Sequence, residues 1–363
     1  MKLHFLHIST AQPWRGGEQQ LVYLFEELHQ QNIKQTIVCT KKSALEKHCI
    51  ESGKQFISLQ KKGSFDIAFA YQLKKISGEN SILHVHDSHA HTAAVLSSIL
   101  FRNKAPIIVS RRVDFKIGDN FLSTFKYNYR SVKKIICVSD AIKKIISPEI
   151  KDQTKLVTIH DGVDLNKFEI GKISKTKLRS EFTIPDDYYL IGNVAALAPH
   201  KDYYTFIDTA SILIQKNIKA KFVMIGEGPE RKKLEAYIKQ KNMSEHIIMT
   251  GFRNDIKEIL PELDIFLITS ETEGLGSSIL DAMLCKVPVV ATNAGGIPEI
   301  IKHHETGLLA PIKNSITLAE NIEILISNPE LKNKFIKNAL NLVNKFSKEN
   351  MATKTLEVYK EMY

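Results

Sequence analysis

Short runs of β-branched and aliphatic residues alternate with longer segments whose apolar residues recur every three or four positions. This alternation predicts parallel strands connected by helices, because a strand buried on both faces reads as a continuous apolar run. In the first half of the chain the predicted strands cover residues 3–8, 33–39, 55–59, 81–85, 106–110, 134–138 and 155–159. Helices are predicted between them, as at 18–30 and 89–102. The order indicates a doubly wound α/β domain.

The pattern lapses over residues 160–187, where charged and turn-forming residues predict a linker. Alternation then resumes, with strands predicted at 188–194, 220–226, 246–250, 263–268, 287–291 and 307–309. The helices predicted among them are 201–216, 229–241, 254–260 and 276–286, and from about residue 314 the chain is expected to be helical without a further strand. We therefore expect two Rossmann-like domains, residues 1–168 and 169–345, facing a cleft into which their strand-to-helix loops point.

The excess of basic residues is confined to the first half of the chain. Residues 1–170 contain 25 lysines and arginines against 16 acidic residues, whereas the remainder contains 25 against 24. This asymmetry predicts an anionic partner for the first half: a membrane surface, a phosphorylated substrate or nucleic acid. A well-solvated basic surface without a partner is the alternative. No nucleic-acid recognition motif is present in the sequence, so a nucleic-acid partner is not expected.

The segment "FLSTFKYNYRSVKK", residues 121–134, interleaves aromatic and basic residues. It predicts either a helix that packs its aromatic face on the sheet or one that rests on an anionic inner membrane, which suits a lipid-linked acceptor. The N-terminus lacks the features of a signal peptide, and no window reaches the roughly 18 apolar residues of a membrane span. The four cysteines have no metal-ligand spacing. We therefore expect a cytoplasmic protein with reduced thiols, peripheral to the inner membrane at most.

Two strand-to-helix loops are rich in glycine, which lets backbone N–H groups approach an anion at a helix N-terminus. Gly16 and Gly17 immediately precede the first predicted helix. In the second half, the loop residues expected to face phosphate are Gly274, Leu275, Gly276 and Ser277. The sequence therefore predicts a phosphate-binding loop in each domain.

Two acidic residues flank the second loop. A carboxylate does not suit phosphate, but it accepts paired hydrogen bonds from vicinal hydroxyls, as the acid of a dinucleotide-binding fold does with a ribose. Asp281 is therefore expected on a ribose and Glu273 on the hydroxyls of a sugar, although two acids that stabilise a helix start are the alternative. Lys201 begins the helix predicted after 188–194 and can neutralise a diphosphate. Glu299 is expected to point from the first turn of a short helix in "AGGIPEII".

The segment "HVHDSHAH" places four histidines and an aspartate close together. A metal site is disfavoured, because His84 and His86 lie at alternate positions of a predicted strand, and substrate contacts are favoured instead. The sequence contains neither a D-x-D motif nor a phosphate-binding P-loop. We expect no metal and no cofactor.

The run "DIFLITSETEGLGSSILDAMLCKVPVVATNAGGIPEIIKHHETGLLAP" resembles the signature region of the family-4 glycosyltransferases of GT-B fold. Further matches, in the family's order, are "WRGGEQQLVYL", "ILHVHDSHAH", "IICVSDAIKKII", "VTIHDGVDLNKF" and "VMIGEGPERKKLE". The resemblance covers the whole chain and implies a retaining, metal-independent transferase. Its donor is then a nucleotide diphosphate sugar, UDP- or GDP-linked, and its acceptor a glycan or a lipid-linked glycan of bacterial surface polysaccharide or lipopolysaccharide synthesis. It also implies that a last helix, about 346–363, packs back on the N-terminal domain.

Transferred to this sequence, the resemblance implies that Glu273 contacts the donor sugar and that Asp281 contacts the ribose. Lys201 matches the lysine that neutralises the diphosphate, whereas the partner arginine of the family is Ala196 here. Base selection in such folds rests on contacts near 250–255, which makes Arg253 a donor-binding candidate. The acceptor-side candidates are Gln19, His86 and His89.

This chain also departs from the family at the segment after strand 106–110, where "SRRVDF" replaces a motif with a histidine that approaches the sugar in many members. Arg111 and Arg112 stand there, and we hypothesise that they supply the charge lost at Ala196, Arg112 as a catalytic residue and Arg111 as a donor-binding one. Two alternatives to a transferase stay open: a GT-B-fold sugar-nucleotide epimerase, and a catalytically silent homologue that binds a sugar nucleotide.

Overall fold

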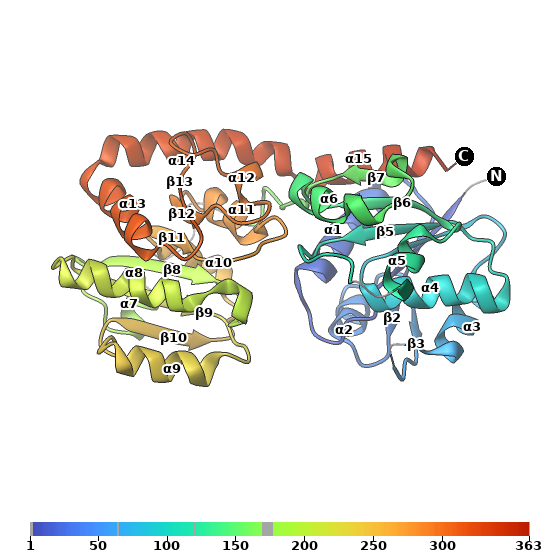
Figure 1. Cartoon of the computed structure of the whole chain (residues 1–363), viewed down its shortest axis with the longest axis horizontal. Helices are drawn as coiled ribbons and strands as arrows, with labels where there is room; N and C mark the ends of the chain where they lie inside the picture. The colour runs from blue at the N-terminus through green and yellow to red at the C-terminus, as the bar shows by residue number, and fades with distance from the viewer. Residues whose placement is uncertain (1–2, 64, 119–120, 169–176, 363) are drawn as a thin grey trace. The chain divides into compact units, whose positions relative to one another are not determined.

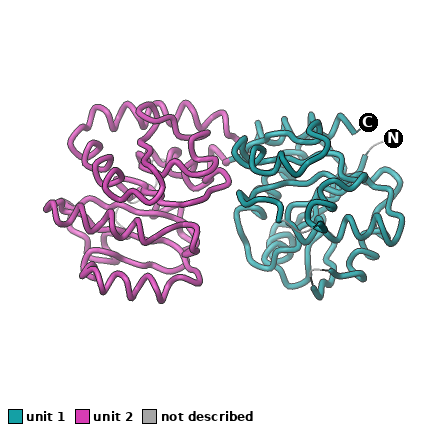
Figure 2. The backbone as a smooth tube through the Cα atoms, viewed as in Figure 1, with its two compact units in different colours: residues 1–162, 348–363 teal, residues 163–347 magenta. Residues whose placement is uncertain are grey.

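The computed structural model of the chain describes residues 3–63, 65–118, 121–168 and 177–362. It divides into two compact units, unit 1 (residues 1–162 and 348–363) and unit 2 (residues 163–347), coloured separately in Figure 2. Each unit contains one parallel sheet with helices on it, so the predicted α/β class is confirmed. Within the described part of the chain, no helix combines the length and hydropathy that crossing a bilayer requires.

Unit 1 is built on a seven-stranded parallel sheet of order β3-β2-β1-β4-β5-β6-β7 (Figure 1). Its strands are β1 (His4–Ile8), β2 (Gln35–Thr40), β3 (Phe56–Leu59), β4 (Ser81–Val85), β5 (Ile107–Arg111), β6 (Val132–Cys137) and β7 (Leu156–Thr158). Its helices are α1 (Gly16–Gln30), α2 (Ala44–Glu51), α3 (Ile67–Ile76), α4 (Ser88–Phe101), α5 (Phe121–Asn128), α6 (Asp140–Ile146) and α15 (Lys348–Lys360), with short 3-10 turns at Ser147–Glu149 and Gln153–Lys155.

The C-terminal helix α15 completes the core of unit 1. It packs against α1, and Met351, Val358 and Tyr359 belong to the same buried cluster as Phe5 of β1. The ring of Tyr359 stacks on that of Phe5 with 4.0 Å between the ring centres. Burial of a whole tyrosine ring contributes on the order of 2 kcal/mol, so α15 is an integral part of unit 1.

Unit 2 is built on a six-stranded parallel sheet of order β10-β9-β8-β11-β12-β13. Its strands are β8 (Tyr189–Val194), β9 (Ala220–Ile225), β10 (Ile247–Gly251), β11 (Ile265–Ile268), β12 (Val289–Thr292) and β13 (Leu308–Ala310). Its helices are α7 (Lys177–Glu181), α8 (Tyr203–Gln215), α9 (Arg231–Gln240), α10 (Ile256–Ile259), α11 (Ser277–Leu284), α12 (Ile297–Ile300), α13 (Ser315–Ser327) and α14 (Pro329–Val343), with 3-10 turns at Pro199–Lys201, Leu260–Glu262 and Asn344–Phe346.

The predicted strands of both halves are found within two residues of their expected bounds, because continuous apolar runs mark strands that are buried on both faces. The linker prediction is only partly tested, since residues 169–176 lie outside the described residues. Its part at 177–181 forms the helix α7. Residues 163–168 belong to unit 2 rather than to the first domain, because Val163 N–H donates to the carbonyl of Phe346 at 2.8 Å.

Three local predictions are wrong. Gly16 and Gly17 do not precede the first helix but form its first turn, since the helix begins after Arg15. Lys201 does not begin a helix: it ends a 3-10 turn, and α8 starts after Asp202, whose side chain accepts from Thr205 N–H. The segment 121–134 is not one helix, because α5 ends at Asn128 and the lysines near its end belong to β6.

Candidate functional site

In each unit, the polar side chains gather where the strand order reverses, which is where open α/β sheets bind ligands. In unit 1 this point lies between β1 and β4, and in unit 2 between β8 and β11. Most of the residues predicted from the sequence lie in the loops after these four strands or in the helices that directly follow the loops.

In unit 2, the loops after β8 and β11 meet through an ion pair between Lys201 and Glu273. Both side chains are largely buried, and the same Glu273 oxygen accepts a hydrogen bond from Ser270 Oγ at 3.2 Å. Thr269 Oγ1 donates to the carbonyls of Lys201 and Asp202 at 3.1 and 2.9 Å, which binds one loop to the other. The structure therefore brings together the two residues predicted to contact the donor sugar and its diphosphate.

Glycines fix these loops by packing main chain directly against main chain. A Cβ on Gly295 would lie 2.0 Å from the carbonyl oxygen of Glu273, and one on Gly226 would lie 2.0 Å from that of Ala195. Gly296 N–H donates to the Glu273 carbonyl at 2.9 Å. No side chain fits in either place, so the glycine pairs around the site set the backbone positions of Ala195 and Glu273.

Asp281, on the second turn of α11, pairs with Lys167 of the segment after β7, with 2.6 Å between Oδ2 and Nζ. Burial raises the pKa of the Asp281 carboxyl, and the Lys167 ammonium acts against this rise. The predicted ribose-binding acid is thus charge-balanced by a lysine that the sequence reasoning did not single out. The only available sign was its place in "VDLNKF", a part of the family motif.

The other residues predicted in this loop have different environments. Gly276 adopts a left-handed conformation with φ of 88° and precedes α11, whereas Ser277 at the start of α11 is exposed. The side chain of Leu275 is buried, so only its backbone is available to a ligand. Glu299 lies in the first turn of α12, as predicted.

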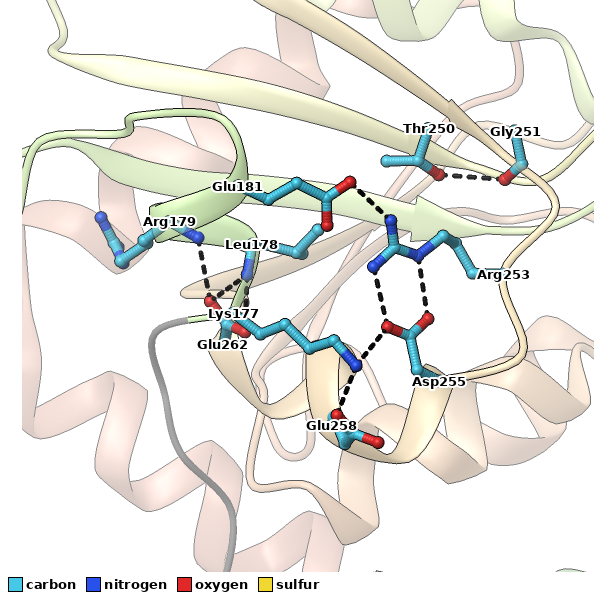
Figure 3. A network of polar contacts seen from close by, with 10 residues as sticks. All are labelled: Lys177, Leu178, Arg179, Glu181, Thr250, Gly251, Arg253, Asp255, Glu258 and Glu262. Carbon is cyan, nitrogen blue, oxygen red and sulfur yellow. Dashed lines mark hydrogen bonds and ion pairs between the residues drawn. The ribbon is translucent and has the colours of Figure 1, made fainter.

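Arg253 lies in a network of ion pairs that joins α7 to the loop after β10 (Figure 3). Its guanidinium makes a two-point contact with Asp255 at 2.7 and 2.8 Å, and a third contact with Glu181 at 2.7 Å. Hydrogen bonds from Arg253 hold the pKa of the Asp255 carboxyl well below its usual range. These contacts give the side chain of Arg253 a structural role in unit 2, beside its predicted place near the base.

Unit 1 contains a pocket of about 660 Å³ at the carboxyl ends of its strands. Five predicted residues line it: Gly17, His86, His89, Arg111 and Arg112. Gly16 and Gln19 are not among its lining residues. The lining also includes Glu18 and Asp87, neither of which was predicted as a site residue.

Glu18 and Asp87 hold the loop that follows β1. Glu18 accepts hydrogen bonds from Ser9 Oγ at 2.8 Å and from Arg15 N–H at 3.1 Å, and burial raises the pKa of its carboxyl. Asp87 accepts from Thr10 Oγ1 at 2.8 Å and also caps α4. The sequence contains no capping-box signature for Glu18, because the N-cap residue three positions earlier is Arg15 and not Ser, Thr, Asp or Asn.

Two buried histidines, His86 and His7, form a directional hydrogen-bond chain in this region. Arg112 only donates, so its contact at 3.5 Å makes His86 Nδ1 an acceptor and leaves the proton on Nε2. His86 Nε2 then donates to His7 Nδ1 at 3.2 Å, and His7 Nε2 donates to Gln35 Oε1 at 3.1 Å. Burial lowers the pKa of His7 to about 4 and the pKa of His86 well below its ordinary value, so the chain is neutral.

The third histidine, His84, contacts Tyr359 and Ser110 at 2.5 and 2.8 Å. Its nitrogens and those of His7 and His86 approach one another within 4.8 Å, close enough for a shared metal ion. All six ring nitrogens nevertheless have a protein partner, so the chain is satisfied without one. Of the three histidines only His86 lines the pocket, whereas His7 and His84 are buried behind it.

The two arginines after β5 have different partners. Arg112 Nε donates to Asp161 Oδ1 at 3.0 Å, and burial raises the pKa of Asp161 although Arg112 counteracts it. Arg111 is buried, donates to Tyr127 Oη at 3.0 Å and to the carbonyl of Phe115, and lies against both rings. Asp161, in the "HDGVD" segment, was missed because nothing in the sequence linked it to a residue 49 positions earlier.

Two family descriptions match the chain. Residues 14–167 match Glycosyltransferase Family 4, and residues 174–342 match Glycosyl transferases group 1. The chain is 31% identical over 302 residues to an uncharacterized glycosyltransferase of Methanocaldococcus jannaschii, covering 81% of this chain and 80% of that protein. It is 25% identical over 384 residues to the UDP-Gal:alpha-D-GlcNAc-diphosphoundecaprenol alpha-1,3-galactosyltransferase of Escherichia coli, covering 99% and 97%.

Solved structures share the fold over the full length. HepE of Anabaena, crystallised in complex with UDP and glucose, matches with a TM-score of 0.87 and 18% identity, covering 99% of this chain and 100% of that one. TarM of S. aureus, in complex with UDP and other ligands, matches with a TM-score of 0.80 and 16% identity over 99% and 100%. By its two parallel sheets, its sequence relatives and these neighbours, the chain belongs to the family-4 glycosyltransferases of GT-B fold.

Proposed function

We propose that this glycosyltransferase moves a sugar, with retention of configuration and without a metal, from a UDP- or GDP-sugar to a glycan or lipid-linked acceptor. The observation that carries the proposal is the Lys201–Glu273 pair, which stands at the point of unit 2 where the strand order reverses. The E. coli relative named above acts on a sugar linked to diphosphoundecaprenol, which supports a lipid-linked acceptor in surface polysaccharide synthesis.

In this proposal unit 2 binds the donor. Glu273 accepts hydrogen bonds from the transferred sugar and Asp281 from the ribose hydroxyls, while the amides of residues 274–277 face the diphosphate. Gly274, Gly276 and Ser277 therefore contribute backbone contacts, and Glu299 lies on the neighbouring loop. When the sugar leaves, negative charge develops on the diphosphate, and Lys201 lowers the barrier by stabilising that charge.

The pocket of unit 1 is proposed to bind the acceptor. His86 and His89 line it with polar groups for sugar hydroxyls, and Arg112 supplies a cation. Arg112 is the better of the two arginines for this role, because both terminal nitrogens of Arg111 already contact Tyr127 and Phe115. We retain Arg112 as a catalytic candidate and assign no protein nucleophile.

The first experiment is a thermal-shift panel of UDP- and GDP-sugars. A cognate donor at about 100 times its dissociation constant should stabilise the native state by ~2.7 kcal/mol. Transfer to a synthetic lipid-linked acceptor is then followed by mass spectrometry, and NMR of the product gives the anomeric configuration. Inversion of configuration would refute retention, and loss of transfer in EDTA would refute metal independence.

One observation favours a second candidate, a catalytically silent sugar-nucleotide-binding protein. Ala196 stands where the resemblance to the family implies an arginine on the diphosphate, so unit 2 lacks that cation. Donor binding without transfer and without slow donor hydrolysis would support this candidate. An epimerised sugar nucleotide as the only product would instead support an epimerase.

A further inference from the structure

Exposed apolar side chains are concentrated on one row of helices in unit 1. Among the described residues, 12 of the 16 large hydrophobic side chains classed as exposed belong to unit 1. Many of them lie on or beside α3, α4 and α5, which pack side by side (Figure 1). They are Ile67, Tyr71, Ile99, Leu100, Val113, Phe115, Phe121, Leu122 and Phe125. A cluster of exposed apolar side chains indicates a binding surface, because isolated exposed side chains would be scattered over the protein and not concentrated on neighbouring helices.

The most exposed of these residues are on α5. Phe121 is 79% exposed and Leu122 is 61% exposed, so neither contributes to the core. Phe121 stacks on Phe125 with 5.9 Å between ring centres, and Phe125 lies 5.6 Å from Tyr129. The aromatic side chains thus form a ladder along the outside of the helix, and only Tyr127 turns inward. The expectation that this helix packs its aromatic face on the sheet is wrong for Phe121 and Phe125.

Cations surround the ladder. A groove of about 690 Å³ runs between the end of α4 and the end of α5, with Ile99, Phe125 and Tyr129 on its walls. Its charged lining residues are Arg102, Lys104, Arg130 and Lys133. No acidic residue is among the residues described as lining it. The groove therefore presents four positive charges beside exposed aromatic rings, which suits an anionic surface with an apolar interior.

This surface continues into the pocket of unit 1. Tyr127 of α5 and Phe115 both line the pocket, and Lys126 Nζ donates to Ser88 Oγ at 2.9 Å on the pocket rim. Phe125 on the outer side of α5 therefore lines the basic groove, whereas Tyr127 on its inner side lines the pocket. A molecule anchored at the outer side of α5 has its polar end close to the pocket.

We propose that the α4–α5 face, defined as Ile99, Leu100, Phe121, Leu122 and Phe125 with the four cations of the groove, docks on an anionic lipid bilayer. The aromatic and aliphatic side chains enter the interface while the cations contact lipid phosphates. A second copy of the chain would bring four cations against four cations, so self-association through this face is opposed by charge. Docking is independent of the chemistry in unit 2; its consequence, delivery of a lipid-linked acceptor to the pocket, rests on the proposed function.

The test is co-sedimentation of the full chain with vesicles of phosphatidylcholine alone or with 30% phosphatidylglycerol. We expect sedimentation with the anionic vesicles, weakened by salt. The double variant Phe121→Ser with Leu122→Ser should bind at least roughly ten-fold more weakly, because the removed apolar area no longer enters the interface. The double variant Arg130→Gln with Lys133→Gln should lose about five-fold for each charge removed.

The matched control is Ile316→Ser, which removes a large apolar side chain that is 62% exposed, much as Leu122 is, but belongs to unit 2. Its vesicle binding should equal that of the unchanged chain. Unchanged binding in both double variants, equal binding to neutral vesicles, or sedimentation with neither vesicle overturns the proposal. Dimerisation lost in the Phe121 variant, without vesicle binding, would also overturn it in favour of self-association. Transfer to a short water-soluble acceptor should be unchanged in all variants. Vesicle binding therefore tests the docking proposal, and transfer to this acceptor separately tests the transferase proposal.

Discussion

The two units share one architecture but differ in charge and in how glycine is used. Unit 1 carries 27 lysines and arginines against 17 acidic residues, whereas unit 2 carries 23 of each, so the whole excess of ten charges lies in unit 1. Gly16 and Gly17 have open space around them, whereas Gly226 and Gly295 pack against backbone carbonyls. Similar loops thus have glycine for different reasons. In unit 1 it leaves open space beside the backbone for a ligand, and in unit 2 it lets two segments of main chain pack closely.

The buried titrating groups differ as well. In unit 2 the carboxylates of Glu273 and Asp281 pair with Lys201 and Lys167. The site of unit 1 contains neutral histidines instead, and the Arg112–Asp161 pair lies beside them. We therefore expect acid to destabilise unit 1 first. We expect the removal of a single charged group to impair function most strongly in unit 2.

The largest expected effect is therefore on the acid stability of unit 1. Burial lowers the pKa of His7 to about 4 and the pKa values of His84 and His86 well below the ordinary 6.5. The unfolded chain binds protons below pH 6.5 while these folded histidines stay neutral, so the free energy of unfolding falls as pH drops toward 4. The expected slope is about 1.4 kcal/mol per pH unit for each histidine.

Hydrogen exchange read separately on the two units at pH 7 and pH 5 measures this difference, with unit 2 as the internal control. Protection should fall in β1 and β4 before it falls in β8 and β11. Equal loss of protection in both units would contradict the account of the histidine chain.

The next effect in size is on turnover. Glu273→Gln keeps the shape of the side chain but removes its charge and leaves Lys201 without its partner. We expect turnover to fall about 10³-fold because the lost charge acts at the reacting sugar, and Tm to fall as well because Lys201 stays largely buried without its partner. The control is Glu271→Gln, two residues earlier in the same loop, where the carboxylate pairs with the exposed Lys313. Comparable losses in both variants would remove Glu273 from the catalytic candidates.

A smaller effect is expected from glycine packing. Gly295→Ala should lower the free energy of unfolding by about 2 kcal/mol or more, because its Cβ meets the Glu273 carbonyl and its φ of 50° is strained for alanine. Gly63→Ala, which meets nothing within 4 Å, is the matched substitution in unit 1. Thermal denaturation of both variants measures the contrast, and equal Tm values would show that unit 2 does not depend on this close approach.

The smallest effect is expected at Asp281. Lys167→Met removes the ammonium that opposes the burial-induced rise in the pKa of Asp281, so this pKa should rise further. The carboxylate fraction then falls as pH decreases, and we expect KM for the donor to increase roughly ten-fold toward low pH while kcat changes little. Lys167→Arg should restore the pH profile. A pH-independent KM in Lys167→Met would argue against an ionised Asp281 on the ribose.

The sequence predicted the sheets well, because parallel strands buried on both faces are continuous apolar runs that need no partner to be recognised. It predicted Glu273, Lys201 and Asp281 from loop position and family motif, and the structure brings the first two together. It did not predict the partners Lys167 and Asp161, which are 114 and 49 positions away from the residues they pair with. Nor did it predict that Phe121 faces outward, because a helix with an aromatic face has the same sequence pattern whether that face packs on a sheet or on a membrane.

The position of α15 has a consequence for how the chain acquires its fold during synthesis. The hydroxyl of Tyr359, near the C-terminus, reaches His84, and its ring covers Phe5 near the N-terminus. All of unit 2 must therefore leave the ribosome before the core of unit 1 can close, although most of unit 1 is translated first. Until α15 is synthesised, the apolar face of unit 1 that it covers stays exposed. Premature termination before α15 would leave this face exposed permanently and make the chain prone to aggregation and proteolysis.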